Sequence, residues 1–348
     1  MATKSGNEST DLTREKTSTM LLSLVIPVYN EEEAFPFLLP SLAPVLEQLG
    51  CCYEIIFIND GSRDRSWELL CEAAARDPRL KLLNFSRNFG HQPAISAGID
   101  FAVGEAVVVM DADLQDPPDL LIKMVDLYHQ GYDVVSAQRT VRHGDSWLKR
   151  KTASWFYTIM QRMVDPRLVP EVGDFRLFSR RAIRGLRGFR EQHRFMRGLV
   201  AWLGLREAIV PFERQPRAAG ETKYPAHKML IFAWTAISSF SAMPLRLSFA
   251  LGLGLMSFGF LYFLYAVYRM VFTQETVVGW TSLVALQCLF SGATMFLLGL
   301  VGDYIARLYE ESKGRPLYVI DDSRNFPPNL PQPVRALYLE RTEPGNAL

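Results

Sequence analysis

The chain has 348 residues, of which 22% are charged and 49% are hydrophobic, and its formal net charge is +1. This balance argues against a nucleic-acid-binding protein, because such proteins carry an excess of basic charge. The length allows one sizeable core with a smaller appendage. The cysteines match no zinc-binding spacing and are expected to be reduced thiols in the cytosol. They are Cys51, Cys52, Cys71 and Cys288.

Residues 1–19 are polar and charged, and we expect them to be disordered. The apolar run Met20–Pro27 is too short for the core of a signal peptide, and no small-residue cleavage site follows it. The run is typical of a β-strand. We therefore expect the globular part of the chain to stay in the cytosol.

Residues 20–225 are predicted to form an α/β domain with a mostly parallel sheet. Short unbroken apolar runs alternate with helical patterns here, which is typical of a sheet covered by helices on both faces. The expected strands are Leu21–Pro27, Tyr53–Ile58, Leu80–Phe85, Ala106–Met110 and Asp133–Ala137. The expected helices are Ala34–Leu49, Ser66–Arg76, Gln92–Val103 and one that begins at Pro117.

Two aromatic, amphipathic segments follow. The first, 147–164, begins with the basic cluster Lys149, Arg150 and Lys151. Such a helix fits the interface of a membrane, and it fits an ordinary surface helix packed on the domain equally well. The second, 226–246, leads directly into the most apolar part of the chain.

Two long segments, Leu247–Tyr268 and Thr276–Gly302, contain no charged residue. Each reaches the length of about 20 residues that crosses a bilayer. We predict transmembrane helices at about 247–270 and 278–302. Basic residues gather outside this pair, which predicts that both of its ends are cytosolic. The remainder, 303–348, is expected to be a cytosolic segment that is disordered beyond about residue 321.

Three polar motifs stand at the ends of expected strands: Pro27–Glu31, Asn59–Ser62 and Asp111–Asp113. Each motif alone could be a turn or a helix cap. Together they point to a ligand site, because open α/β sheets bind ligands at the carboxyl ends of their strands.

Asp111 and Asp113 are two residues apart, so on an extended segment they point to the same side, and Gln115 continues the spacing. Their oxygens suit Mg²⁺ or Mn²⁺ held jointly with substrate phosphates. The glycine patterns of dinucleotide-binding folds and of P-loop NTPases are absent from the sequence, which disfavours both classes. His91 and His193 have no evident partner in the sequence.

The segments Val25–Glu31, Asn59–Ser62 and Asp111–Pro118 resemble the family 2 inverting glycosyltransferases of GT-A (Rossmann-like) fold. Within that family the chain is similar to the polyprenyl-phosphate branch, which includes dolichol-phosphate mannose synthases and bactoprenol glucosyltransferases. The resemblance covers roughly Leu21–Ile320, including the apolar hairpin. Asn59 departs from the aspartate of many relatives, and Asp60 beside it is kept. The supporting matches are Phe85–Gly90, Gly173–Leu177 and Gly220–Tyr224.

The resemblance implies roles for individual residues. The metal ligands would be Asp111, Asp113 and Gln115, which hold Mg²⁺ or Mn²⁺ against the donor diphosphate. Asp174 matches the proposed catalytic aspartate of the family, and Asp113 is expected to take part in catalysis with it. The residues expected to bind the donor nucleotide are Pro27, Tyr29, Glu31, Asp60 and Asp111.

The acceptor expected from the resemblance is a lipid monophosphate. Its second pKa is about 6, so the attacking oxygen is mostly ionised at neutral pH and needs no strong base. We therefore expect Asp174 to act mainly in positioning. Two anions must also approach one sugar carbon, which requires cations. The candidates for binding the acceptor phosphate are Arg139, Arg150, Arg176 and Lys223, each of which could instead be a solvated surface residue.

The expected reaction is transfer of a hexose to polyprenyl phosphate with inversion. Glucose from UDP-glucose is the first choice, and GDP-mannose, an aminoarabinose derivative and N-acetylhexosamines stay open. The expected setting is a bacterial inner membrane, with a cytosolic catalytic domain, homo-oligomers and no nucleic acid. A processive polysaccharide synthase is disfavoured, because Gln192–Phe195 does not fit its Gln-x-x-Arg-Trp motif. Two transmembrane helices also cannot enclose a polymer channel by themselves. Intact carboxylates argue against a non-catalytic membrane scaffold.

Overall fold

The structure, a computed structural model, describes five continuous segments and six single positions. The segments are 20–140, 172–213, 243–273, 279–327 and 336–338, and the single positions are 161, 167, 169, 170, 238 and 241. The chain divides into two compact units, and each is described by itself. The first unit comprises Met1–Met229 and Arg315–Leu348, and the second comprises Leu230–Gly314.

The first unit is built on a sheet whose described strands lie in the order β7-β5-β6-β4-β1-β2-β3-β8-β9. The strands β4, β1, β2 and β3 are parallel, whereas β6 and β8 run antiparallel to their neighbours in this group. The strand bounds are β1 Leu21–Val28, β2 Cys52–Asn59, β3 Leu80–Phe85, β4 Ala106–Val109, β5 Val134–Arg139, β6 Val172–Ser179, β7 Glu207–Phe212, β8 Tyr318–Arg324 and β9 Ala336–Tyr338.

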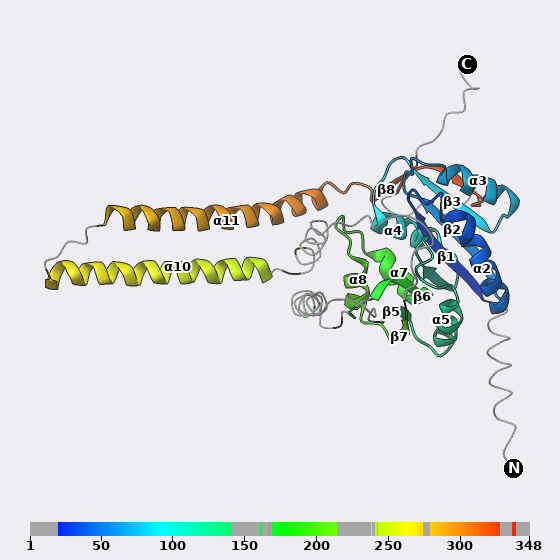
Figure 1. The fold of residues 1–348 in the computed structure, drawn as a ribbon, viewed down its shortest axis with the longest axis horizontal. Coiled ribbons are helices and arrows are strands. Elements are labelled where there is room, and N and C mark those ends of the chain that lie inside the picture. The colour runs from blue at the N-terminus through cyan, green and yellow to red at the C-terminus, as the bar shows by residue number, and fades with distance from the viewer. Residues whose placement is uncertain are drawn as a thin grey trace, which may run out of the picture. The chain divides into compact units, whose positions relative to one another are not determined.

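Helices cover both faces of this sheet (Figure 1). Alternate residues of a strand point to opposite faces, and Leu24 and Ile26 join the core cluster formed with α2, α3 and α5. Val25 points to the other face, where α4 approaches so closely that a Cβ at Gly98 would meet Val25 Cγ1 at 2.1 Å. Helix α7 contacts α4 and α8. The helix bounds are α2 Phe35–Leu49, α3 Ser66–Arg76, α4 His91–Phe101, α5 Leu120–His129, α7 Arg180–Gly188 and α8 Met196–Leu203.

The expected α/β architecture with a mostly parallel sheet is confirmed, and the expected strands and helices up to residue 137 are present within a few residues of their predicted bounds. The helix expected to begin at Pro117 begins at Leu120. β6, α7, α8 and β7 were not predicted from the sequence; β6 and β7 belong to the sheet on the β4 side.

The expectation of disorder beyond about residue 321 is wrong for two short segments. β8 continues to Arg324 and pairs with β3, and β9 pairs with β8. The physical reason lies in burial: Tyr318 and Ile320 are 0% and 1% exposed. These apolar side chains pack on the sheet while the β3 edge supplies backbone hydrogen-bond partners.

The second unit contains the apolar hairpin. Helix α10 spans Met243–Tyr268, a π-helical turn η1 spans Arg269–Thr273, and helix α11 spans Trp280–Ser312. Within them, Met243–Tyr265 and Leu289–Ser312 are long and apolar enough to cross a membrane. Two such helices were expected, at about 247–270 and 278–302.

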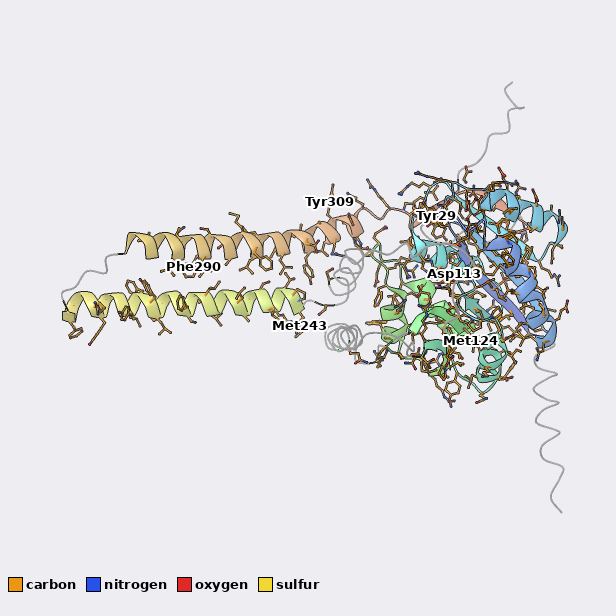
Figure 2. All side chains as sticks on the ribbon, viewed as in Figure 1. Tyr29, Asp113, Met124, Met243, Phe290 and Tyr309 are labelled. Carbon is orange, nitrogen blue, oxygen red and sulfur yellow. The ribbon has the colours of Figure 1, made fainter. Side chains whose placement is uncertain are left out.

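The two helices contact each other through a small residue. A Cβ at Gly259 of α10 would meet the ring of Phe290 at 3.2 Å, and Phe290 of α11 points toward α10 (Figure 2). Large apolar side chains elsewhere on the helices are exposed, among them Phe249 and Phe296. This all-round apolar surface is typical of helices that face lipid. The amphipathic segments 147–164 and 226–246 lie almost entirely outside the described residues.

Candidate active site

The topology gathers polar residues at one edge of the sheet. The carboxyl ends of β1, β2 and β4 share this edge because the three strands are parallel. β6 is antiparallel to β4, so its amino end, with Asp174, lies at the same edge. β5 is antiparallel to β6, which brings its last residue, Arg139, there too. The motifs singled out in the sequence therefore lie on neighbouring strands.

The loops after β1 and β2 are joined by hydrogen bonds. The backbone N–H of Asn30 donates to Ser62 Oγ (3.0 Å), and that of Glu31 donates to Ser66 Oγ (2.9 Å). Pro27 lies within β1, opposite Ile58 of β2, and the side chain of Tyr29 is 39% exposed. Both loops were expected from the sequence to bind a donor nucleotide, and the Tyr29 side chain is accessible to solvent.

Asp60 is buried, at 3% exposure, and its carboxylate is engaged by the backbone. Oδ1 accepts hydrogen bonds from the N–H groups of Phe89 (2.7 Å) and Gly90 (3.3 Å), and Oδ2 accepts one from Gly90 (3.0 Å). Burial raises the pKa of Asp60, and the hydrogen bonds from Phe89 and Gly90 oppose that rise. The carboxylate thus fixes the turn that precedes α4.

Gly61 brings the backbone of the β2 loop against that same turn. Its φ is +64°, and a Cβ there would lie 2.5 Å from the carbonyl carbon of Arg87 and 2.6 Å from the nitrogen of Asn88. Only glycine fits a left-handed conformation with so close a backbone approach. The loop after β2 and the turn before α4 therefore form one packed unit.

The loop after β4 carries the expected metal ligands. Asp113 Oδ1 accepts a hydrogen bond from the N–H of Gln115 (3.2 Å), and Leu114 between them has a φ of +56°. Burial raises the pKa of Asp111, and the negative charges of Asp174 and Asp113 raise it further. Both carboxylates therefore lie close enough to Asp111 to destabilise its ionised form.

This donor set fits a hard divalent cation. Within the described residues no three His, Cys, Asp or Glu side chains form a metal-binding group. Mg²⁺ does not need one, because it is usually held by one or two carboxylates with water and substrate phosphates. A cation beside Asp111 and Asp113 would relieve the repulsion between their charges.

His91, the first residue of α4, lies between two of these carboxylates. Its Nε2 is 3.2 Å from Asp174 Oδ2 and 3.6 Å from Asp111 Oδ1. Burial lowers the pKa of His91, but the hydrogen bond to Asp174 and the charges of Asp111 and Asp174 outweigh it and raise the pKa to about 9. No partner for His91 was evident in the sequence, and in the structure it has two, Asp174 and Asp111.

Asp174 is held on both oxygens. Oδ2 faces His91 and also accepts a hydrogen bond from Gln92 Nε2 (3.4 Å), and Oδ1 is 3.7 Å from Arg197 Nε. Burial raises the pKa of Asp174, but Arg197, His91 and Arg176 together hold it well below its usual range. The carboxylate is therefore ionised, and its orientation is fixed from three sides.

The arginines expected at the acceptor phosphate differ in their access. Arg176 is 3% exposed, and its Nε and Nη1 have no hydrogen-bond partner in the described part of the chain. Burial lowers its pKa to about 10, while the charges of Glu207 and Asp174 oppose that change. Arg139 is 25% exposed and lies 3.5 Å from Asp116.

Arg150 and Lys223 lie outside the described residues. The functional candidates that sequence reasoning missed are His91, Gln92 and Arg197. Only His91 and Gln92 could have been found from the sequence, because they directly follow the Phe85–Gly90 motif.

Comparison with known proteins gives two family matches. Residues 23–187 match the model of glycosyl transferase family 2, and residues 243–308 match that of the GtrB C-terminal hairpin. An uncharacterized glycosyltransferase of Bacillus subtilis (strain 168), YkcC, is 46% identical over 301 residues, or 86% of this chain and 93% of that protein. The bactoprenol glucosyl transferase of Shigella phage SfV is 38% identical over 305 residues, or 88% of this chain and 99% of that protein.

A solved structure is also similar. It is glucosyl-3-phosphoglycerate synthase from Mycobacterium tuberculosis in complex with Mn²⁺, uridine diphosphate and glucosyl-3-phosphoglycerate. The identity is 19%, the TM-score is 0.46, and the match covers 65% of this chain and 80% of that chain.

Proposed function

This chain belongs to glycosyl transferase family 2, and from that premise we propose that it transfers glucose from UDP-glucose to a polyprenyl phosphate, with inversion at the anomeric carbon. The proposal takes its acceptor and sugar from the bactoprenol glucosyl transferases, which the chain matches over nearly their whole length. GDP-mannose or another UDP-sugar is the alternative donor for the same reaction.

The observation that carries the proposal is the meeting of Asp111 and Asp174 at His91, at 3.6 and 3.2 Å. One carboxylate stands in the loop expected to hold the donor diphosphate, and the other in the motif expected to serve the acceptor. We infer that their common neighbour, His91, places the donor and acceptor sites next to each other. Holding two reactants in the right geometry lowers the barrier of the reaction between them.

We propose that Asp111, Asp113 and Gln115 hold Mg²⁺ or Mn²⁺. Bound there, the cation would neutralise charge that develops on the leaving diphosphate. The Asx turn between Asp113 and Gln115 prepares this loop before any ligand arrives, because it fixes one carboxylate oxygen. Gln115 is 7% exposed, which limits its motion.

The chain's own residues divide the remaining work. Tyr29 and Glu31 are proposed to contact the nucleotide from the loop after β1. The carboxylate of Asp60 is buried and accepts backbone hydrogen bonds, so we assign it a positioning role in the donor site rather than contact with the base. We assign Pro27 a positioning role too, because it lies near the end of β1, two residues before Tyr29.

At the acceptor, Asp174 orients the groups around the lipid phosphate and Arg197 and Arg139 supply positive charge. An oxygen of the phosphate attacks the anomeric carbon as the bond to the diphosphate breaks, and no proton need move when that oxygen is already ionised. Arg176 is too buried for contact at 3% exposure and contributes through its field. Arg150 and Lys223 stay predictions.

The apolar hairpin matches the GtrB C-terminal hairpin family and associates the chain with a membrane. We propose a bacterial inner membrane with the catalytic unit and both termini on the cytosolic side, as the basic residues outside the hairpin indicate. Labelling of single cysteines introduced at residues 5 and 344 in intact and opened cells would test this. We also propose a homo-oligomer, which light scattering in detergent would measure.

The reaction is tested with the purified full chain in vesicles that contain polyprenyl phosphate. A panel of labelled nucleotide sugars is supplied with Mg²⁺ or Mn²⁺, and the glycolipid is identified by mass spectrometry. We expect a glucosyl lipid from UDP-glucose and none from an Asp111→Asn variant. If a glycolipid forms only from another donor, the proposed sugar is wrong. If a soluble polymer forms, the proposed transfer to a lipid phosphate is wrong.

A further inference from the structure

The turn Ser86–Gly90 is supported from two sides. The carboxylate of Asp60 holds its end, at Phe89 and Gly90. Its beginning is held by β8, because the N–H of Ser86 donates a hydrogen bond to the carbonyl oxygen of Val319 (3.0 Å). β8 therefore lies against the segment that leads into the candidate active site.

Tyr318, the first residue of β8, is fixed at both ends of its side chain. Its ring stacks on that of Phe85 with centroids 5.2 Å apart and planes 12° apart. Its hydroxyl donates a hydrogen bond to Asp100 Oδ2 (2.8 Å), and Asp100 in turn pairs with Arg190 at 2.7 and 2.8 Å. The side chain is 0% exposed.

The contacts continue from Tyr318 to the site. Phe85 meets Phe89 edge to face, with centroids 5.6 Å apart. Phe89 is two residues before His91, whose Nε2 lies between Asp174 and Asp111. Tyr318 is thus connected to His91 by two ring contacts, through Phe85 and Phe89, and by two residues of backbone.

We propose that Tyr318 is a positioning residue for the transfer reaction: through Phe85 and Phe89 it sets the turn that carries His91 to Asp174 and Asp111. The proposal rests on the proposed function. Tyr318 lies outside both family matches, which end at residues 187 and 308. It follows the end of α11 at Ser312 by six positions, so the hairpin and this support are joined by a short connection.

A first test needs no activity. Hydrogen exchange of the peptide covering residues 86–92 is measured in the full chain for the wild type, Tyr318→Leu and Phe326→Leu. Phe326 is the matched control, because it belongs to the same C-terminal segment and packs on Phe101 instead of on the turn (5.4 Å). We expect exchange at Phe89 and Gly90 to rise about tenfold in Tyr318→Leu alone, through local opening.

Unchanged exchange in Tyr318→Leu, or an equal rise in Phe326→Leu, would overturn the proposal. Should Tyr318→Leu fail to fold, Tyr318→Met decides in its place. This variant fills much of the same space with a flexible side chain but loses the ring that stacks on Phe85. Faster exchange at Phe89 and Gly90 supports the proposal, and wild-type exchange contradicts it.

A second test is a double-mutant cycle on kcat for glycolipid formation, with Tyr318→Leu and His91→Gln. Misplacement of the turn should lower kcat about 10- to 100-fold in the wild-type background. In the His91→Gln background we expect a loss below about twofold, because the residue through which Tyr318 acts is already gone. If Tyr318 contributes to stability alone, the fold losses in kcat of the two single variants multiply in the double variant. That result would overturn the proposal.

These measurements distinguish failure of the proposed function from failure of the positioning role of Tyr318. If the wild type forms no glycolipid from any donor, the proposed function fails, and the exchange measurement still reports whether Tyr318 holds the turn. If the wild type is active and the two losses multiply, the proposed function stands and the positioning role fails.

Discussion

His91 Nε2 lies 3.2 Å from Asp174 Oδ2, which joins the first turn of α4 to the start of β6. The contact extends an alternation of charge across the site: Asp111, His91, Asp174 and Arg197 follow one another at 3.6, 3.2 and 3.7 Å. Asp174 is ionised before any ligand binds, because Arg197, His91 and Arg176 hold its pKa well below the usual range. The pKa of Asp111 is raised by burial and by the charges of Asp174 and Asp113, and His91 opposes that rise.

The proton on His91 should stabilise the chelator-treated protein in a pH-dependent way. The folded pKa is raised from 6.5 to about 9, so the contribution is complete below pH 6.5 and is lost as the pH rises through 9. Thermal unfolding of the wild type and His91→Gln should therefore differ most at pH 6 and converge near pH 10. The difference is modest, since the histidine is 38% exposed and solvent screens the pair. A gap that widens with pH would contradict this assignment.

Gly61→Ala should destabilise the protein more than Gly50→Ala. Both glycines have nearly the same φ, +64° and +63°, so both variants bear the cost of a left-handed alanine, about 1–2 kcal/mol. Only at Gly61 would the Cβ meet backbone, at 2.5 Å, whereas nothing lies within 4 Å at Gly50. We expect an additional loss of about 1–3 kcal/mol for Gly61→Ala. Denaturant unfolding of the two variants measures it, and equal losses would show that the β2 loop and the turn before α4 are not packed together.

The sequence predicted the strands that are unbroken apolar runs and missed those whose polar residues serve the site. β6 carries Asp174 and Arg176 on one face, which interrupts its apolar pattern. In α7 several arginines hide the apolar face formed by Ile183 and Leu186. The end of β8 was assigned to the disordered tail because Asp321 and Asp322 resemble the polar residues that follow.

Asp60, Asp111 and Asp113 were predictable because they follow strands along the chain, whereas Asp174 was identified from the family resemblance. The partners of Asp174 were not predictable, since β6 enters the sheet between β4 and β5 in an order that local patterns do not encode. Arg197 reaches Asp174 from α8, and its side chain gives no periodic signal. Contacts between segments far apart in sequence need the fold itself.

Removal of divalent cations should abolish transfer, and Mg²⁺ or Mn²⁺ should restore it. Asp113→Ala should raise the cation concentration needed for half-maximal activity about 10- to 100-fold, because one of few hard ligands is lost. Asp119→Ala is the control: its carboxylate is in the same loop region, exposed, and makes no cap hydrogen bond to α5. Activity that persists in excess EDTA would contradict metal dependence. An equal cation requirement in both variants would contradict the assignment of Asp113 as a ligand.

Asp174→Asn should lower kcat about 100-fold through loss of positioning, and raising the pH should recover little of it. The lipid phosphate is already ionised above its second pKa of about 6, so the variant lacks a positioning anion rather than a base. Its neighbours support this assignment, because Arg197, His91 and Arg176 hold the pKa of Asp174 well below the range useful for accepting a proton. Rates for both proteins are measured from pH 6.5 to 9 with saturating donor and acceptor, and circular dichroism checks that the variant is folded. Restoration of wild-type kcat at high pH would establish base catalysis and reverse this conclusion.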